Sequence, residues 1–146
     1  MLQYLISINE AAGGPPNPQV HQAAQIIAWH CCLRSTFKPR QVGDKHLVQK
    51  ALRDANLNED LLDHLRERLK IIRTVPREER FLQILLDPLA EYLAALHVRT
   101  HCAGDDSRWQ EFLSEADSKP DAPAAIRGFM TALRVCCVAH GSSVPS

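Results

Sequence analysis

With 146 residues, the chain is long enough for one domain with a substantial core, and its 45% apolar and 23% charged residues are typical of a folded protein. Its 17 basic and 17 acidic side chains balance, which excludes a strong overall field for nucleic acid, anionic lipid or an acidic substrate. No stretch approaches the roughly 20 uninterrupted apolar residues that span a bilayer, and the apolar start lacks the basic flank of a signal peptide. We therefore expect a cytoplasmic protein with no membrane and no nucleic-acid partner.

The first half of the chain is predicted to contain three helices. Residues 1–18 should form a short packed apolar segment followed by a linker rich in Pro and Gly. Apolar residues then recur at helical spacing over 19–34. A second helix is expected over 44–55, with Asp44 as its N-cap, and a third over 58–72, where Leu and Ile form the core stripe.

The second half is predicted to continue in the same way, with a segment over 76–86 counted among the helices. Asp87 is expected to cap the next helix, with Pro88 at its first position. The remaining elements are a break at 104–107, a helix that carries Trp109, a break at 119–123, a last helix to about His140 with Gly141 as its stop, and a tail at 142–146. The sequence thus predicts an all-α domain over 19–141, an irregular bundle of about six to seven short amphipathic helices.

Histidine and cysteine gather in three clusters, at 30–32, 97–102 and 136–140, which suggests a possible metal site. Neutral imidazole with thiolate suits zinc, and two of the clusters place ligands one helical turn apart. However, no C-x-x-C pair is present, and cysteines within apolar helical runs are usually buried core residues. We expect no metal and no cofactor. In the alternative interpretation, a small metal-binding regulatory protein, the ligands would be His97, His101, Cys102, Cys136 and His140.

Catalytic motifs are not found in the sequence. None of the six glycines opens a phosphate-binding loop, and the possible Cys–His pairs lack a nucleophile elbow and an acidic third member. Basic residues from Arg66 to Arg80 alternate with Glu, as on a solvated helix face with local ion pairs. Trp29 and Trp109 are predicted to be core anchors rather than ligand platforms. The chain is predicted not to be an enzyme, and a cysteine-dependent enzyme is the weakest alternative.

Three segments suggest a family relationship: DPLAEYLAALH at 87–97, WQEFL at 109–113 and IRGFMTALR at 126–134. In this order they resemble the C-terminal helical region of bacterial NACHT-type (STAND) signalling ATPases. The resemblance implies a helical sensor or scaffold region, in proteins associated with antiphage defence, whose ATPase core lies N-terminal to the matched segment. No catalytic residue carries over, because the matched segment contains none.

The leading hypothesis is therefore a non-catalytic helical interaction or sensor module that resembles the C-terminal region of a NACHT-type defence ATPase. Its partner would be another protein or the neighbouring domains of a larger ATPase. We expect the contact to use exposed apolar positions, with a homodimer as one consequence.

Overall fold

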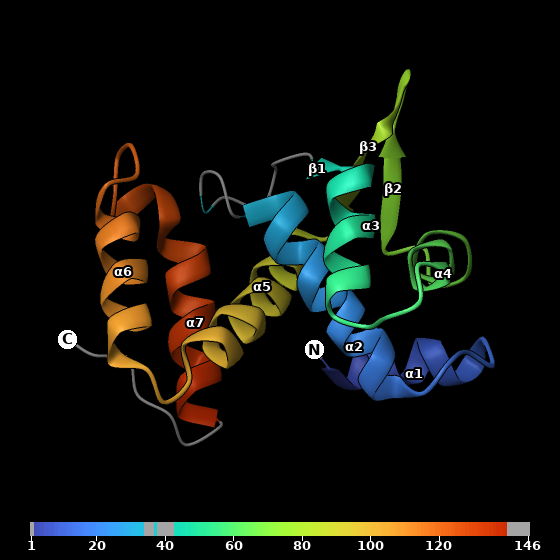
Figure 1. Cartoon of the computed structure of the whole chain (residues 1–146), viewed down its shortest axis with the longest axis horizontal. Coiled ribbons are helices and arrows are strands. Elements are labelled where there is room, and N and C mark those ends of the chain that lie inside the picture. Colours follow the sequence, from blue (N-terminus) through green and yellow to red (C-terminus); the bar gives the residue numbers. More distant parts are fainter. Residues whose placement is uncertain (1, 34–36, 38–42, 140–146) are drawn as a thin grey trace.

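The computed structural model describes residues 2–33, 37 and 43–139, and most of these residues lie in helices. Helix α5 (Asp87–Cys102) crosses the middle of the molecule (Figure 1). Helices α6 (Asp106–Asp117) and α7 (Arg127–Ala139) lie at one end, and the N-terminal helices and a small sheet lie at the other. The predicted irregular multi-helix fold is confirmed, while the sheet was not expected.

The chain begins with helix α1 (Leu2–Ala11), which is followed by α2 (Asn17–Ile27). The helix predicted over 19–34 is present, but its second part is a π-helical segment, η1 (Ala28–Leu33). Such wider turns are rare and occur frequently at functional sites. The π geometry therefore directs attention to the side chains that η1 carries.

Asn9 of α1 is a buried polar residue, 2% exposed, and it joins several elements. Its Nδ2 donates to the Pro15 carbonyl and to Asn17 Oδ1, both at 2.8 Å. His64 Nε2 donates to Asn9 Oδ1 at 2.7 Å, since an amide oxygen can only accept. A Cβ at Gly14 would overlap both Asn9 and the His64 ring, so a glycine is required there. This network holds α1 against the body of the protein.

Helices α3 (Lys45–Asp54) and α4 (Asp60–Asp63) follow, and α4 continues into a second π-helical segment, η2 (His64–Arg68). Asp44 caps α3 as predicted, because its side chain accepts from the His46 N–H at 2.8 Å.

A three-stranded antiparallel sheet combines a short strand before α3 with a hairpin between η2 and α5. Its strands β1 (Gly43–Asp44), β2 (Ile72–Val75) and β3 (Glu78–Ile84) are arranged in the order β1-β3-β2. The prediction of a helical segment over 76–86 is therefore wrong. The third predicted helix also ends before 72, and the basic run interpreted as one helix face is divided between η2 and this sheet.

The apolar residues of this region alternate with a period of two, as in a strand, and not with the period of a helix. Ile72 lies opposite Ile84 and Thr74 opposite Leu82, so that Leu82 and Ile84 are buried on one face. This alternation, with β-branched residues in β2, is typical of a strand. Pro also begins helices, but here Pro76 begins a two-residue turn, and the next residue, Arg77, takes a positive φ of 67°.

The second half is helical, as predicted, with one correction at its start. Helix α5 already includes Asp87 as its first residue, so the N-cap position is occupied by Leu86 and not by Asp87. In α6 the cap is Asp105, which accepts from the Arg108 N–H at 3.1 Å. The short η3 (Ala124–Ile126) leads into α7. The predicted end of the last helix at His140 and Gly141 lies outside the described residues.

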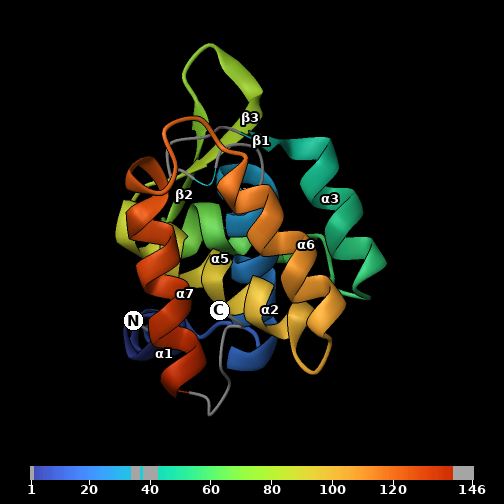
Figure 2. The ribbon, with the colours of Figure 1, turned by 90° about the vertical axis from the view of Figure 1, so that its left-hand side faces the viewer.

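The core is centred on α5, which is buried on most of its surface, as expected of a central helix. Figure 2 shows α6 and α7 in front of it. The Phe112 ring of α6 packs against the Phe37 ring at 5.2 Å and against the Phe129 ring of α7 at 6.0 Å, measured between centroids. The buried residues of α5 are Leu89, Ala90, Leu93, Ala94, Ala95, Leu96, Val98 and Cys102.

Candidate functional site

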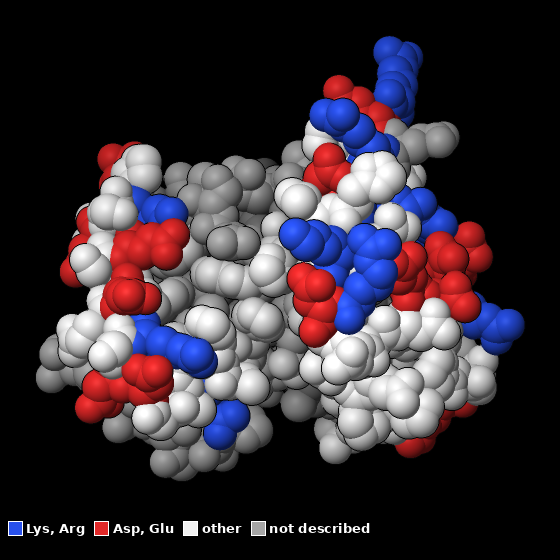
Figure 3. Space-filling model, in the orientation of Figure 1, with Lys and Arg blue, Asp and Glu red and all other residues white. Residues whose placement is uncertain are grey.

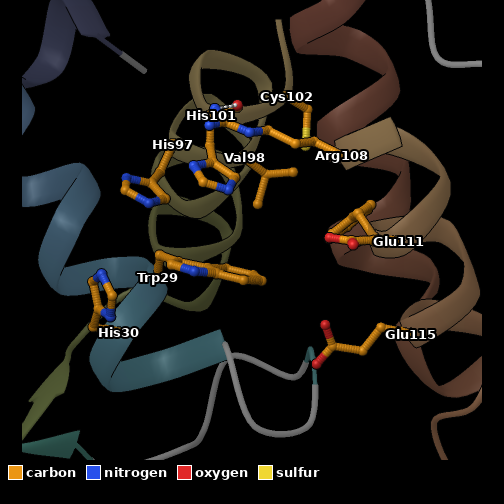
Figure 4. A pocket seen from close by; sticks show the side chains of 10 residues that line it. Trp29, His30, His97, Val98, His101, Cys102, Arg108, Glu111 and Glu115 are labelled. Carbon is orange, nitrogen blue, oxygen red and sulfur yellow. Dashed lines mark hydrogen bonds between the residues drawn. The ribbon is translucent and has the colours of Figure 1, made fainter. Parts of the chain in front are cut away.

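A pocket of about 540 Å³ lies where α5, α6 and η1 meet, and we call it the α5–α6 pocket (Figure 4). Its volume is in the range of small-ligand sites. It is lined by Trp29, His30, His97, Val98, His101, Cys102, Arg108, Glu111, Phe112 and Glu115.

One wall of the pocket consists of aromatic and imidazole rings. His97 and His101 lie one turn apart on α5, and their rings are stacked with centroids 6.5 Å apart and planes at 4°. Trp29 extends from η1 and stacks on His97 at 6.2 Å, while His30 meets His97 edge-on at 5.7 Å. Trp29 is only partly buried, so it is both a packing residue and a lining residue, whereas Trp109 is buried as predicted.

His97, in the wall of rings, carries little positive charge. Burial lowers the pKa of His97 from 6.5 to about 4, and the neighbouring His30 and His101 lower it further in the same direction. His97 is therefore neutral at physiological pH. Within the described part of the chain the ring is held by its contacts with Trp29, His30 and His101.

The opposite wall is the acidic face of α6. The carboxylates of Glu111 and Glu115 lie one helical turn apart and point into the pocket toward Trp29 (Figure 4). Arg108 is turned toward α5, where its Nη1 donates to the His101 carbonyl at 2.9 Å and its Nε pairs with Asp105 at 3.4 Å. Two chemically different walls therefore face each other across the pocket.

A second hollow of about 540 Å³ adjoins the first, and the two share His30 and Glu115. Its other lining residues come from α3 and the end of α6: Leu47, Lys50, Ala51, Asp54 and Lys119. Leu47 is 64% exposed there. The pocket thus continues as a groove toward α3.

The candidate metal ligands are only partly brought together. His97, His101 and Cys102 line the α5–α6 pocket, whereas Cys136 is buried on α7 with its Sγ 4.0 Å from the Tyr92 carbonyl. His140 lies outside the described residues, as do the side chains of Cys31 and Cys32. Within the described part, no group of three His, Cys, Asp or Glu side chains could hold a metal ion.

The described cysteines are thiols rather than thiolates. Burial raises the pKa of Cys102 and Cys137, and it raises the pKa of Cys136 to about 11, with Cys137 as the next cause. Because the thiolate is the nucleophile, raised pKa values argue against reactive cysteines. All three are buried, as expected of core residues.

Sequence reasoning did not single out Arg108, Glu111 and Glu115, and it assigned Trp29 to the core. One signal was available. The two glutamates stand four residues apart, which places them on one face of a helix. What the sequence did not reveal is that this face lies opposite Trp29.

Comparisons with known proteins give no relative: no family model, no curated protein and no solved structure matches this chain. In the described residues, no helix combines the length and apolar character needed to cross a bilayer.

Proposed function

We propose that this chain is a non-catalytic helical recognition module whose binding surface is the α5–α6 pocket. The observation that carries the proposal is the composition of that pocket, in which a wall of rings faces two carboxylates. An aromatic, partly apolar surface with a few polar groups is the usual composition of a ligand site. The raised pKa of the Cys102 thiol supports binding over nucleophilic chemistry.

We further propose that the module is a C-terminal region of a NACHT-type signalling ATPase in the cytoplasm. Two observations support this proposal: the order of the matched segments in the sequence and their positions in the fold. The three segments that resemble this family lie on α5, α6 and the η3–α7 unit, and these helices pack around one core. These segments include the buried residues Leu93, Phe112 and Phe129, which belong to the core that holds the pocket.

The partner would be a protein or a neighbouring domain of the same ATPase. Exposed apolar residues are available for such a contact: Val135 and Val138 of α7 are 54% and 74% exposed. A homodimer of the isolated chain through such positions remains a prediction.

The test begins with the mass of the endogenous product, detected with an antibody against this chain. We expect a product much larger than 16.4 kDa that carries a phosphate-binding loop and hydrolyses ATP. A native product of about 16.4 kDa would contradict the relationship to an ATPase.

The recognition role is tested in the larger product. Glu111→Lys, which reverses a charge in the pocket, should change how ATP hydrolysis responds to the activating signal in cells. Glu67→Lys is the matched control, because Glu67 is exposed on η2 and does not line the pocket. An equal response in the wild type and in Glu111→Lys would contradict the recognition role.

A further inference from the structure

Resting on the proposed recognition role, we infer that the α5–α6 pocket binds an organic cation, a guanidinium or alkylammonium group, between the Trp29 ring and the carboxylates of Glu111 and Glu115. A cation attached to a flat or aliphatic body would contact both walls at once. Its charge would face α6, and its body would lie against the rings of η1 and α5.

The ring wall suits a cation because of its electronic character. The face of an indole attracts cations, and this attraction strengthens where water is excluded. Trp29 also stacks with His97 and Phe129, at 6.2 and 6.0 Å between centroids, so a cation would contact the part of the ring that lines the pocket. In Figure 4 the Trp29 side chain projects into the space between α5 and α6, toward the two glutamates. The protein already contains a contact of this type, since the Lys119 Nζ lies 4.8 Å from the centroid of the neighbouring Phe37 ring.

The acidic wall supplies the opposite charge. Helix α6 carries four carboxylates against one arginine, and Figure 3 shows acidic side chains concentrated over this helix. Glu111 makes no ion pair within the described residues, so its charge is available to a ligand. Glu115 pairs with Lys119 at 3.3 Å, and its side chain is half exposed, so a bound cation would share Glu115 with Lys119.

Among the described basic groups around the site, Lys119 pairs with Glu115 at 3.3 Å. Arg108 is held at the rim by the His101 carbonyl and by Asp105. His97 is neutral at physiological pH for the reasons given above. Glu111 is therefore the pocket carboxylate without an ion pair among the described residues, and it favours a ligand that carries a positive charge.

The probes are Nα-acetyl-arginine amide, which represents a peptide side chain, and agmatine, which represents a free cation. The neutral control is Nα-acetyl-citrulline amide, which has the same shape but a urea in place of the guanidinium. Binding is followed by NMR through the two indole N–H signals. Trp29→Phe identifies the Trp29 signal, and Trp109 is an internal reference because it is buried outside the pocket.

We expect both cations to shift the Trp29 signal and to leave the Trp109 signal in place, with the citrulline compound binding at least about fivefold more weakly. Glu111→Gln and Glu115→Gln should each weaken binding about two- to fivefold, which is the range of exposed ion pairs. Glu67→Gln, the matched control, should leave binding unchanged. Higher salt should weaken binding in the wild type.

Tighter binding of the acetylated arginine than of agmatine would identify a partner's side chain as the source of the cation, and the reverse order would identify a free amine. Equal binding of the citrulline compound, equal binding by the glutamine variants, or no Trp29 shift with any probe would each overturn the cation inference. None of these results would decide the recognition role, because the regulated ATPase assay tests that role separately.

Discussion

His64 and His97 are both partly buried histidines with a lowered pKa, yet they are held in different ways. For His64, burial lowers the pKa first and the nearby Arg68 lowers it further, and its Nε2 is fixed by Asn9. For His97, burial acts together with two other imidazoles, and within the described residues the ring is held by stacking on Trp29 and His101 rather than by hydrogen bonds.

The two surroundings have different consequences. At His64 the Pro15 carbonyl and the amide side chains of Asn9 and Asn17 form one connected hydrogen-bond network, which anchors α1 to η2. At His97 the rings border a cavity whose other wall carries Glu111 and Glu115. A satisfied polar cluster stabilises the fold, whereas an unmatched one next to a cavity is available to a ligand.

The largest effect is expected at the anchor. Asn9→Leu leaves the Pro15 carbonyl, Asn17 and His64 without their buried partner, and each lost partner costs about 1–3 kcal/mol. We expect the free energy of unfolding in urea to fall by at least about 3 kcal/mol. Gln22→Ala on the exposed side of α2 is the control and should change it by less than about 0.5 kcal/mol. A similar small change for Asn9→Leu would show that the network is not an anchor.

Lowering the pH should reduce the free energy of unfolding through His97. Its pKa is about 4 in the folded protein and 6.5 without burial, so between these values the unfolded chain binds more protons and stability falls as the pH falls. The loss of stability is at most about 3 kcal/mol, and the contribution of His97 is fully present above pH 6.5. The groups that face His97 are Trp29 and His30 from η1 and His101 from α5.

Urea unfolding at several pH values measures this dependence. His97→Gln should remove most of the slope between pH 6.5 and 4, and His64→Gln should remove less. If the His64 variant removes the larger part of the pH dependence, the contrast between the two histidines is contradicted.

Two glycines, Gly14 and Gly128, differ in what an added Cβ would contact. A Cβ at Gly14 would meet Asn9 and His64, which cannot move without breaking their hydrogen bond, so Gly14→Ala should cost about 2 kcal/mol. A Cβ at Gly128 would meet only the carboxylate end of Glu91, so Gly128→Ala should cost about 1 kcal/mol or less. Adding Glu91→Ala should restore the loss, because alanine favours a helix over glycine. Thermal unfolding measures all three, and equal costs at the two glycines would remove the distinction.

The smallest effect is expected in the pocket wall. Glu111→Gln should change the free energy of unfolding by less than about 0.5 kcal/mol, because Glu111 is exposed and has no ion pair within the described residues. A loss above about 1 kcal/mol would instead give Glu111 a role in the fold. Circular dichroism during heating provides the measurement.

Much of the fold follows from local sequence patterns. Asp44 is both a predicted and an observed cap, and the helices that contain Leu93, Phe112 and Phe129 lie where apolar spacing places them. The sheet was missed because Pro76 begins helices as well as turns, and the alternation on either side of it is short, whereas the pairing of Ile72 with Ile84 identifies the hairpin. Strand pairing is a long-range property, and a local pattern of four to seven residues specifies it weakly.

The pocket could be predicted only in part. His97 and His101 were recognisable as neighbours from their spacing, and they do stack. Their position opposite Glu111 depends on how α5 and α6 pack, and Trp29 reaches them from a segment about 70 residues earlier in the chain, where the helix takes a π form. Neither the packing angle nor the π turn has a clear local signature in this sequence.

The π-helical segment η1 also bears on how such a pocket could arise. A π turn differs from an α turn by one additional residue, and one residue of an α-helix corresponds to about 100° of rotation. Insertion of a single codon into a continuous helix would therefore leave Val20 and Ala24 facing the core and turn Trp29 and His30 toward α5. In evolutionary terms, the proposed recognition surface is one insertion away from an ordinary core helix, so a chain with one residue fewer in this segment would share the fold without sharing the proposed ligand.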